Sequence, residues 1–524
     1  MKELQIPRAY NAASDFVDRN IAEGRADKAA FIDPDSELTY GALQDQSRRF
    51  ANALRHLGVQ PEQRVALIML DTVAMPVAFW GAIRAGVVPV PLNTLLTTQQ
   101  YRFILADARA VALVISRELL PKVEPLLADH PSIHTVIVSD GEAPGYGLRF
   151  DEVLEGSSPD APIAETCSDE VAFWLYSSGS TGNPKGVKHL HSSLMQTAHL
   201  YGQQVLGITE DDVVFSAAKL FFAYGLGNAM SFPMSVGATA ILLPGRPAPD
   251  PVLEVMGSRN PSLFFGVPTL FSALLAHPKL GKGAGSKNLR LCVSAGEALP
   301  KEIGERWLQT VGVDIIDGIG STELLHIFIS NRPGDVTYGS SGTPVPGYAA
   351  RIVDAEGDPV RNGEIGELLV SGPSAGEGYW NQRDKTRATF VGEWTHTGDN
   401  YRRGTDGLYY YCGRSDDMFK VSGNWVSPFE VESALMSHDV VLEAAVVGAE
   451  DADGLVKPKA FIVLKGGFEA YDGLVDELKD HVKAVAGLWK YPRWIEIMDD
   501  LPKTATGKIQ RFKLRQGAPR DAAE

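Results

Sequence analysis

Residues 176–186 combine small hydroxyl side chains, glycines and a single lysine in one short stretch. They read Tyr-Ser-Ser-Gly-Ser-Thr-Gly-Asn-Pro-Lys-Gly and follow the apolar, β-prone segment 171–175. When a strand feeds such a loop, backbone N–H groups, hydroxyls and an ammonium can converge on phosphate oxygens, because glycines allow close approach and positive φ. The candidate phosphate ligands are Ser177, Ser178, Gly179, Ser180, Thr181, Gly182 and Lys185. Lys185 precedes a glycine, which excludes a Walker loop, and a flexible Ser/Gly surface loop is the weaker alternative.

A second glycine-rich turn, Gly318-Ile-Gly-Ser-Thr-Glu323, follows a strand candidate that ends at Asp317. Open α/β sheets bind ligands where strand ends open into such turns. The Glu323 carboxylate could ligate Mg²⁺, a hard cation that prefers carboxylate and phosphate oxygens, and the Thr322 hydroxyl could contact a phosphate. Taken alone, this segment could equally well be the capped start of a helix. That interpretation becomes the weaker one when the phosphate-loop candidate at 176–186 is considered with it.

Three further segments carry polar groups that suit a nucleotide but are ambiguous alone. Ser294–Pro300 reads as an ordinary strand-to-helix turn, and the basic stretch Pro502–Arg511 reads as a solvated tail. The Asp399 carboxylate suits a grip on ribose hydroxyls, and Arg414 adds a planar fork of donors. Taken by itself, Asp399 would more often be a turn residue.

Two rival sites are weaker. Gly372-Pro-Ser374-Ala-Gly376 matches the Gly-x-Ser-x-Gly pattern of a hydrolase nucleophile elbow, but residues 377–382 do not look like the helix that an elbow requires. His189, His191 and His199 lack a further ligand at zinc-like spacing, which favours structural histidines. We therefore expect neither a serine hydrolase nor a zinc site.

Length and composition limit the function classes. A chain of 524 residues exceeds the size of a single hydrophobic core, so at least two domains are expected. The net charge of -16 argues against binding to nucleic acid or to an anionic membrane, which needs a basic surface. The three cysteines have no metal-ligand spacing and fit a reducing compartment. Because the N-terminus lacks a secretory signal and segment 73–92 reads as a buried helix and strand, we expect a cytoplasmic protein.

Strand-like and helix-like patterns alternate through most of the chain, as in parallel α/β layers with crossover helices. The strands predicted there are 64–70, 87–91, 111–115, 135–139, 238–243, 263–265, 291–294 and 314–318, and the helices are 75–85, 98–106, 119–128 and 192–200. Short strands at 350–354, 367–371 and 408–412 predict a β-rich subdomain at about 340–412. A compact pattern then follows, with helices at 428–436 and 473–485 and strands at 440–447 and 459–464. We therefore predict an α/β fold with an N-terminal domain at 1–413, a hinge at 414–417 and a small mobile α+β domain at 418–524.

Together these segments resemble the adenylate-forming superfamily of acyl-CoA ligases, peptide-synthetase adenylation domains and luciferases. The resemblance covers essentially the whole chain, from Leu38-Thr-Tyr-Gly41 to the Lys508 loop. It implies ATP, coenzyme A and Mg²⁺, with Glu323 as the metal ligand. The residues that it places at the nucleotide or at CoA, beyond the phosphate loop, are Ala295, Gly296, Glu297, Asp317, Gly318, Gly320, Thr322, Asp399, Arg414 and Gly423. It makes Asp416 the hinge, and it places Lys508 between the acid carboxylate and the α-phosphate, where a cation reduces the repulsion of two anions.

Within this superfamily the likeness is strongest to the benzoate–CoA ligase branch of aryl-CoA ligases. The segments that carry it are Phe221–Asn228 and Lys420–Pro428. Amino-acid-activating relatives place an aspartate in the first segment, and none occurs between Lys219 and Gly227. The residues implied at a small, flat acid pocket are Ala223, Tyr224, Gly225, Gly266, His326, Ile327 and Lys420. His326 and Lys420 would orient the acid carboxylate, with core and surface roles as their alternatives.

The implied activity is an ATP-dependent ligation in two steps. An aromatic acid such as benzoate forms an acyl-AMP and pyrophosphate, and the thiolate of coenzyme A then displaces AMP. The residues implied in catalysis are Thr322, Glu323, His326 and Lys508. The alternatives are activation of a hydroxybenzoate or a medium-chain acid, transfer to a carrier-protein thiol, and a nucleotide-binding protein without turnover. A homodimer is one candidate assembly.

Overall fold

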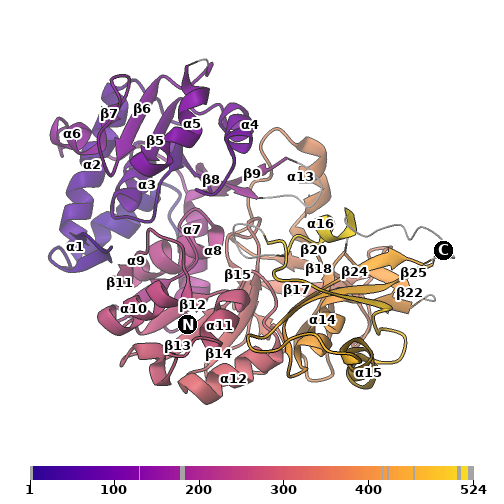
Figure 1. Ribbon diagram of the computed structural model, residues 1–524. Helices are drawn as coiled ribbons and strands as arrows, with labels where there is room; N and C mark the ends of the chain where they lie inside the picture. Colours follow the sequence, from indigo (N-terminus) through magenta and orange to yellow (C-terminus); the bar gives the residue numbers. More distant parts are fainter. Residues whose placement is uncertain are drawn as a thin grey trace.

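The structure is a computed structural model. It describes residues 4–128, 130–177, 183–415, 417–421, 424–451, 455–503 and 509–516. A large N-terminal part, coloured indigo to light orange in Figure 1, is followed by a small C-terminal part in orange and yellow. Two sheets with parallel strands lie one above the other in the larger part, and a short hairpin lies between them (Figure 1). This architecture confirms the predicted α/β class.

The first sheet has five parallel strands in the order β4-β3-β5-β6-β7. The strands are β3 (Arg64–Ile68), β4 (Val88–Pro91), β5 (Ala112–Ser116), β6 (Thr135–Ser139) and β7 (Leu148–Arg149), and the helices are α2 (Tyr40–His56), α3 (Ala74–Arg84), α4 (Thr98–Ala108), α5 (Leu120–Leu127) and α6 (Phe150–Glu155). Every position of β5 is buried, because helices cover parallel sheets and their strands become continuous apolar runs. Segment 73–92 forms α3 and β4 as predicted, and within the described ranges no helix has the length and apolar character to cross a membrane.

The second sheet has nine strands in the order β16-β15-β14-β13-β12-β10-β11-β1-β2. The strands are β1 (Ala29–Ile32), β2 (Glu37–Thr39), β10 (Val213–Ser216), β11 (Thr239–Ile241), β12 (Leu263–Gly266), β13 (Leu291–Ser294), β14 (Ile315–Gly320), β15 (Ile327–Ser330) and β16 (Thr343–Pro344). The helices of this part are α7 (His191–Thr197), α8 (Ala223–Leu226), α9 (Phe232–Val236), α10 (Pro249–Arg259), α11 (Pro268–Leu275) and α12 (Lys301–Val311). Strands β11, β10, β12, β13 and β14 pair in parallel, so the segments that follow β10, β12, β13 and β14 meet at one edge.

The hairpin between the two sheets consists of β8 (Val171–Ser177) and β9 (Lys185–Leu190), which pair antiparallel. The sequence predicts β8 and the helix that follows, but strand β9 is not predicted. Its lysines, glycine and histidine have weak β-propensity, and pairing with β8 decides its conformation. The predicted helix at 192–200 is α7, which continues as a π-helical stretch (Ala198–Gln203).

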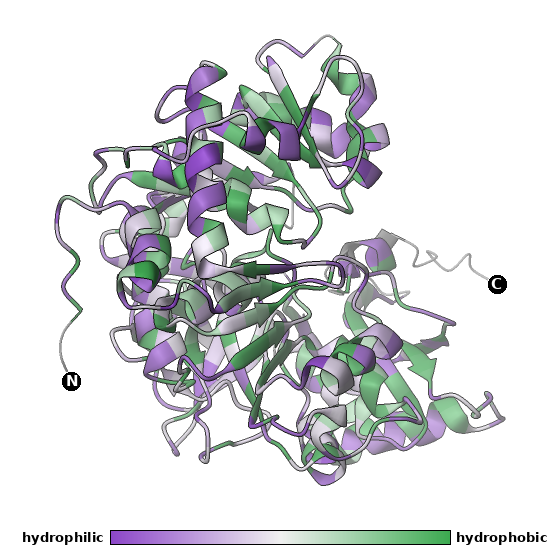
Figure 2. Cartoon of the chain, turned by 90° about the vertical axis from the view of Figure 1, so that its left-hand side faces the viewer, coloured by the Kyte–Doolittle hydropathy of each residue, from purple (hydrophilic) through white to green (hydrophobic). Residues whose placement is uncertain are grey.

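The β-rich region and the C-terminal part complete the chain. The β-rich region contains β17 (Ala349–Val353), β18 (Gly366–Ser371), α13 (Arg383–Thr389), β19 (Phe390–Val391), β20 (Trp394–Arg403) and β21 (Tyr409–Arg414). The C-terminal part contains β22 (Phe419–Val421), β23 (Asn424–Val426), α14 (Pro428–Met436), β24 (Val441–Glu450), β25 (Val456–Leu464), α15 (Leu474–Ala486), β26 (Trp494–Ile497) and α16 (Arg511–Gln516). It has hydrophobic clusters of its own, drawn from residues 421–514. Figure 2 shows hydrophobic residues concentrated in the strands and hydrophilic residues on the outer helices.

Candidate active site

The ends of the parallel strands bring the predicted nucleotide and acid segments to one edge of the second sheet. In the strand register Gly266 lies opposite Ser294, and Ser294 lies opposite Asp317. Residues 295–297 follow Ser294 at the end of β13, and residues 318–323 follow Asp317 through the last positions of β14, which ends at Gly320. Segments far apart in sequence therefore become neighbours, because parallel strands finish at the same edge of a sheet.

Lys185, Glu323 and Tyr379 form a polar cluster beside the phosphate-loop candidates. Lys185 is the first residue of β9 and pairs with Ser177 across the hairpin. Its Nζ lies 3.9 Å from Oε1 of Glu323. The Tyr379 hydroxyl accepts a hydrogen bond from Lys185 at 3.2 Å and donates one to Glu323 at 2.8 Å. Burial lowers the pKa of the Lys185 ammonium, while the Glu323 carboxylate acts in the opposite direction.

Several predicted site residues lie outside the described parts of the chain. They are Ser178, Gly179, Ser180, Thr181, Gly182, Asp416, Gly423 and Lys508. Their roles stay predictions. Directly before Ser178, the Oγ of Ser177 is buried without a hydrogen-bond partner among the described residues. Directly after Lys508, the backbone N–H of Ile509 donates to Oε1 of Glu297 at 3.2 Å, which joins the C-terminal part to the segment after β13.

His326 is buried next to the predicted acid segment, with 3% of its surface exposed. Its Nε2 lies 3.1 Å from Oδ1 of Asn228 and 3.3 Å from the Tyr224 carbonyl oxygen. Because two acceptors face Nε2, this nitrogen carries the proton, while Nδ1 has no partner in the described part of the chain. Burial lowers the pKa of His326 to about 3, so the ring is neutral at pH 7. His326 therefore holds segment 224–228, and its contact with the acid carboxylate stays a prediction.

Other acid-pocket candidates lie in the same region as the buried His326 ring, and Tyr224 contacts that ring. The Tyr224 hydroxyl donates to the backbone oxygens of Gly266 at 3.2 Å and Val293 at 3.0 Å, which fixes this aromatic side chain over the ends of β12 and β13. Ile327 begins β15 and is 1% exposed. Ala223 begins α8 and is also buried. The arrangement provides aromatic and small apolar side chains at the sheet edge.

Close packing accounts for three glycines of this region. A Cβ on Gly225 would overlap the preceding backbone, and one on Gly227 would overlap the His326 ring. A Cβ on Gly266 would lie 2.9 Å from the Phe271 ring. Gly225 and Gly266 are thus explained without a ligand, and their predicted part in substrate binding stays a prediction.

Asp317 and the Asp399–Arg414 pair lie among the predicted nucleotide residues. Asp317 is 5% exposed, and burial raises the pKa of its carboxyl to about 8, so it is largely protonated at pH 7. Asp399 on β20 lies opposite Arg414 on β21, with Oδ1 and Nη1 3.2 Å apart. Arg414 also donates to the Thr397 carbonyl oxygen at 3.1 Å. The pair is held in place by the sheet, as a ribose-binding pair would need to be.

The two glycines of β14 serve the pairing of this strand with β15. A Cβ on Gly318 would lie 2.8 Å from the Ile327 side chain, and one on Gly320 would lie 2.6 Å from the His326 backbone. Gly296, after β13, has φ of 96°, a conformation that favours glycine. All three leave the backbone close to the sheet edge, where the resemblance places the nucleotide.

The sequence profile of the AMP-binding enzyme family matches residues 18–380, and the profile of the family's C-terminal domain matches residues 430–508. This chain is a member of the AMP-binding enzyme family. Both parts of the fold are covered by the match, so the resemblance read from the sequence motifs is confirmed, as are the large N-terminal and small C-terminal domains.

Three known proteins are similar to this AMP-binding enzyme over nearly its whole length. A 4-hydroxybenzoate–CoA/benzoate–CoA ligase of Rhodopseudomonas palustris is 57% identical over 97% of this chain and 94% of its own. A benzoate–CoA ligase of Thauera aromatica is 54% identical over 98% of this chain and 97% of its own. A crystal structure of a benzoate CoA ligase from Burkholderia xenovorans LB400 is 52% identical, covers 97% of this chain and 100% of its own, and has a TM-score of 0.91.

The serine of the hydrolase-like motif has a structural role in this AMP-binding enzyme. Ser374 is fully buried, donates to the Leu324 carbonyl oxygen at 2.7 Å and lies 2.6 Å from the Tyr348 hydroxyl, so it is no exposed nucleophile. His189 and His191 are also buried, and burial lowers the pKa of both, to about 3 and about 4. In the described part of the chain, no three His, Cys, Asp or Glu side chains are grouped so as to bind a metal.

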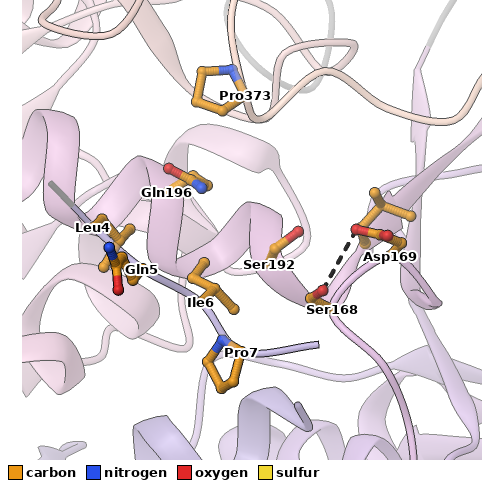
Figure 3. Close-up of a pocket in the computed structure, with 10 residues that line it drawn as sticks. Leu4, Gln5, Ile6, Pro7, Ser168, Asp169, Ser192, Gln196 and Pro373 are labelled. Carbon is orange, nitrogen blue, oxygen red and sulfur yellow. Dashed lines mark hydrogen bonds between the residues drawn. The ribbon is translucent and has the colours of Figure 1, made fainter. Parts of the chain in front are cut away.

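Two pockets in the described part of this AMP-binding enzyme differ in their relation to the predicted site. One of about 440 Å³ adjoins Tyr379 and is lined in part by Lys188, Arg383 and Arg387. The other, of about 750 Å³, lies between N-terminal residues 4–7 and helix α7 (Figure 3) and contains none of the predicted site residues. Lys420, predicted near the acid, lies on β22 with an exposed side chain.

Tyr379, Asn228 and Gly227 were not predicted from the sequence. Tyr379 lies three positions after Gly376, the last residue of the segment that matches the nucleophile-elbow pattern. Asn228 closes the segment Phe221–Asn228 that carries the resemblance to aryl-CoA ligases, and its polarity within an apolar stretch was the available signal. The contacts of all three are long-range, so no local pattern indicates them.

Proposed function

We propose that this AMP-binding enzyme uses ATP to join benzoate, or a benzoate with a small ring substituent, to coenzyme A, releasing AMP and pyrophosphate. The observation that carries the proposal is the turn between Thr322 and His326, closed by a 3.2 Å hydrogen bond from the Leu325 N–H to the Thr322 carbonyl oxygen. Glu323 in this turn belongs to the polar cluster, and His326 belongs to the buried aromatic cluster. One turn therefore joins the residue that we propose for the phosphate side to the residue that we propose for the aryl side.

In the first step, a carboxylate oxygen of the acid attacks the α-phosphorus of ATP. The bond to pyrophosphate breaks and an acyl-AMP forms. Lys185 would bind phosphate oxygens, and Lys508 would lie between the two anions, where a fixed cation lowers the barrier most when water is excluded. The neutral His326 adds no charge on the acid side, and the partly buried Tyr224 ring provides a flat apolar wall for an aromatic ring.

Glu323 would hold Mg²⁺ in this reaction. Proteins usually bind Mg²⁺ through one or two carboxylates together with substrate phosphates. One oxygen of Glu323 accepts from Tyr379, and the side chain is 17% exposed beside the Lys185 ammonium, so the donor set fits the ion. When bound, Mg²⁺ supplies charge neutralisation at the phosphates.

In the second step, the sulfur of the CoA thiolate attacks the acyl carbon and AMP leaves, so a thioester replaces the mixed anhydride. A free thiol with a pKa of about 8.5 is a few per cent ionised at neutral pH, so no dedicated base is needed. We propose that the C-terminal domain rotates about Asp416 between the steps, which would withdraw Lys508 and bring Gly423 to the pantetheine arm.

4-Hydroxybenzoate is the second candidate acid. The relative from Rhodopseudomonas palustris carries both 4-hydroxybenzoate and benzoate in its name and shares 57% of its residues with this chain. A ring hydroxyl changes only the edge of the pocket, so the same machinery would serve both acids.

Pyrophosphate–ATP exchange with Mg²⁺, in the absence of CoA, tests the proposal. The acids are benzoate, 4-hydroxybenzoate, 2-aminobenzoate, cinnamate, octanoate, acetate and phenylalanine. Exchange that is strongest with benzoate or 4-hydroxybenzoate supports the proposal, and exchange that is strongest with octanoate or phenylalanine overturns the substrate. Absence of exchange with every acid overturns adenylation itself. Addition of CoA should then give the aryl-CoA. If the acyl group is transferred only to an acyl-carrier protein, that protein is the acceptor of the second step.

The assembly and the location are also proposals. A homodimer and a cytoplasmic location are consistent with the family and with a described part that contains no membrane-spanning helix. Light scattering on the purified full-length protein tests the first, and fractionation of the source cells tests the second.

A further inference from the structure

We infer that Tyr379 is a positioning residue that bridges the long ion pair of Lys185 and Glu323 and keeps both groups available for Mg-ATP, an inference that rests on the proposed function. Its hydroxyl accepts from Lys185 at 3.2 Å and donates to Glu323 at 2.8 Å. The Lys185 Nζ also lies 4.3 Å from the centroid of the tyrosine ring, within the range of a cation–π contact. One side chain therefore contacts both charged groups of the cluster.

The hydroxyl bridges Lys185 and Glu323, whose own ion pair is long. These two side chains are 18% and 17% exposed, and their charged atoms are 3.9 Å apart. A closer pair in such a partly buried place would bind the two groups more tightly to each other and would have to break before phosphates and Mg²⁺ could bind. The Tyr379 hydroxyl instead offers one acceptor and one donor.

The backbone of Tyr379 is attached to β9, the strand that begins with Lys185. The Trp380 N–H donates to the Gly186 carbonyl oxygen at 2.8 Å, and Val187 lies opposite Tyr379 in an antiparallel bridge. Tyr379 and Lys185 are therefore carried by backbone segments that are bonded to each other, which fixes their relative positions. This attachment gives the hydroxyl a defined position.

The segment that carries Tyr379 also fixes the backbone of Glu323. The Gly376 N–H donates to the Glu323 carbonyl oxygen at 2.8 Å. A Cβ on Gly376 would lie 2.9 Å from the Val187 side chain, so a glycine is required for the segment to pass this close to β9. Residues 376–380 thus connect the strand that carries Lys185 with the turn that carries Glu323.

Tyr379→Phe tests the inference, because it keeps the ring and removes the hydroxyl. The wild-type protein and the variant are titrated with Mg-ATP and with AMP by isothermal titration calorimetry, without any acid. We expect the Kd for Mg-ATP to rise about tenfold, as for the loss of a hydrogen bond to a charged group. The Kd for AMP should change by less than about twofold, because AMP has no β- and γ-phosphates to meet Lys185 or the metal.

Tyr338→Phe is the matched control. Tyr338 donates to the Asp314 carboxylate at 2.9 Å, so this variant loses the same kind of hydrogen bond outside the cluster, and its affinity for Mg-ATP should equal that of the wild type. Unchanged Mg-ATP affinity in Tyr379→Phe would overturn the inference, and so would an equal loss of Mg-ATP and AMP affinity, which would indicate general disruption. Failure of the proposed function has a different signature, namely wild-type protein that binds Mg-ATP but exchanges no pyrophosphate with any acid.

Discussion

The backbone N–H of Ile509 donates a hydrogen bond to Oε1 of Glu297 at 3.2 Å, although the two residues are 212 positions apart. Glu297 follows β13 among the residues predicted at the nucleotide, whereas Ile509 belongs to the C-terminal part. Two residues further on, Arg511 pairs with Glu432 of α14 at 2.7 Å, which ties this stretch to the core of the small domain. The small domain is therefore docked on the nucleotide edge of the large one.

Replacement of Glu297 by alanine should slow adenylation more than thioester formation. The change removes the acceptor for Ile509, and a net hydrogen bond of about 1 kcal/mol corresponds to a several-fold loss of rate. Pyrophosphate exchange measures the first step, and aryl-CoA formation from supplied benzoyl-AMP measures the second. Glu305→Ala, at a surface position of α12, is the control. Equal slowing of both steps would show that this contact does not favour adenylation over thioester formation.

Asp416→Pro should slow thioester formation by about tenfold, or ~1.4 kcal/mol of barrier, with a smaller effect on adenylation. Proline fixes φ and so restricts the rotation that the proposed hinge must make between the two steps. Asp416→Ala removes the same carboxylate without fixing φ, so its thioester formation should be faster than that of Asp416→Pro. The same two half-reaction assays apply, and unchanged rates of both steps in the proline variant would refute the hinge.

Asp317 should make the protein less stable as the pH rises from 4 towards 8. Burial raises its pKa from 3.8 to about 8, so over this range the folded state keeps a proton that the unfolded state has lost. Unfolding therefore releases a proton and becomes easier at higher pH, by about 1.4 kcal/mol per pH unit. Asp317→Asn carries a neutral amide instead, so its free energy of unfolding relative to wild type should increase with pH. Urea unfolding at pH 5, 6 and 7 measures this, and a difference that stays constant with pH would show that Asp317 is ionised in the folded protein.

Two substitutions separate the roles of the His326 nitrogens. His326→Gln can keep an N–H near the position from which Nε2 faces Tyr224 and Asn228, whereas His326→Asn can keep a polar atom only near Nδ1. We expect the Asn variant to lose about 1 kcal/mol more free energy of unfolding, because segment 224–228 loses its donor. Because Nδ1 of this neutral ring is an acceptor and cannot donate to the acid carboxylate, we expect the Gln variant to change the KM for benzoate by less than about twofold. Urea unfolding and exchange kinetics check both, and identical behaviour of the two variants would argue against separate roles.

The parts of the site that could be read from the sequence are those whose chemistry is local. The loop 176–186 and the turn 318–323 concentrate glycines, hydroxyls and single charges within a few residues, which is enough to indicate phosphate and metal binding. Helices and buried strands follow from hydrophobic periodicity, and α14 has the predicted bounds of Pro428–Met436. Strand β9 was missed because its own residues have weak β-propensity and its partner strand decides its conformation.

By itself, the sequence determined the superfamily, the alternating α/β architecture and the segments that carry phosphate chemistry, because each is encoded in a short pattern or a period. Only the tertiary structure decided that Tyr379 meets Lys185 across 194 positions and that Asn228 meets His326 across 98. Such contacts depend on sheet register and on the order of strands within a sheet. These are properties of the packed chain as a whole, and no local pattern of residues encodes them.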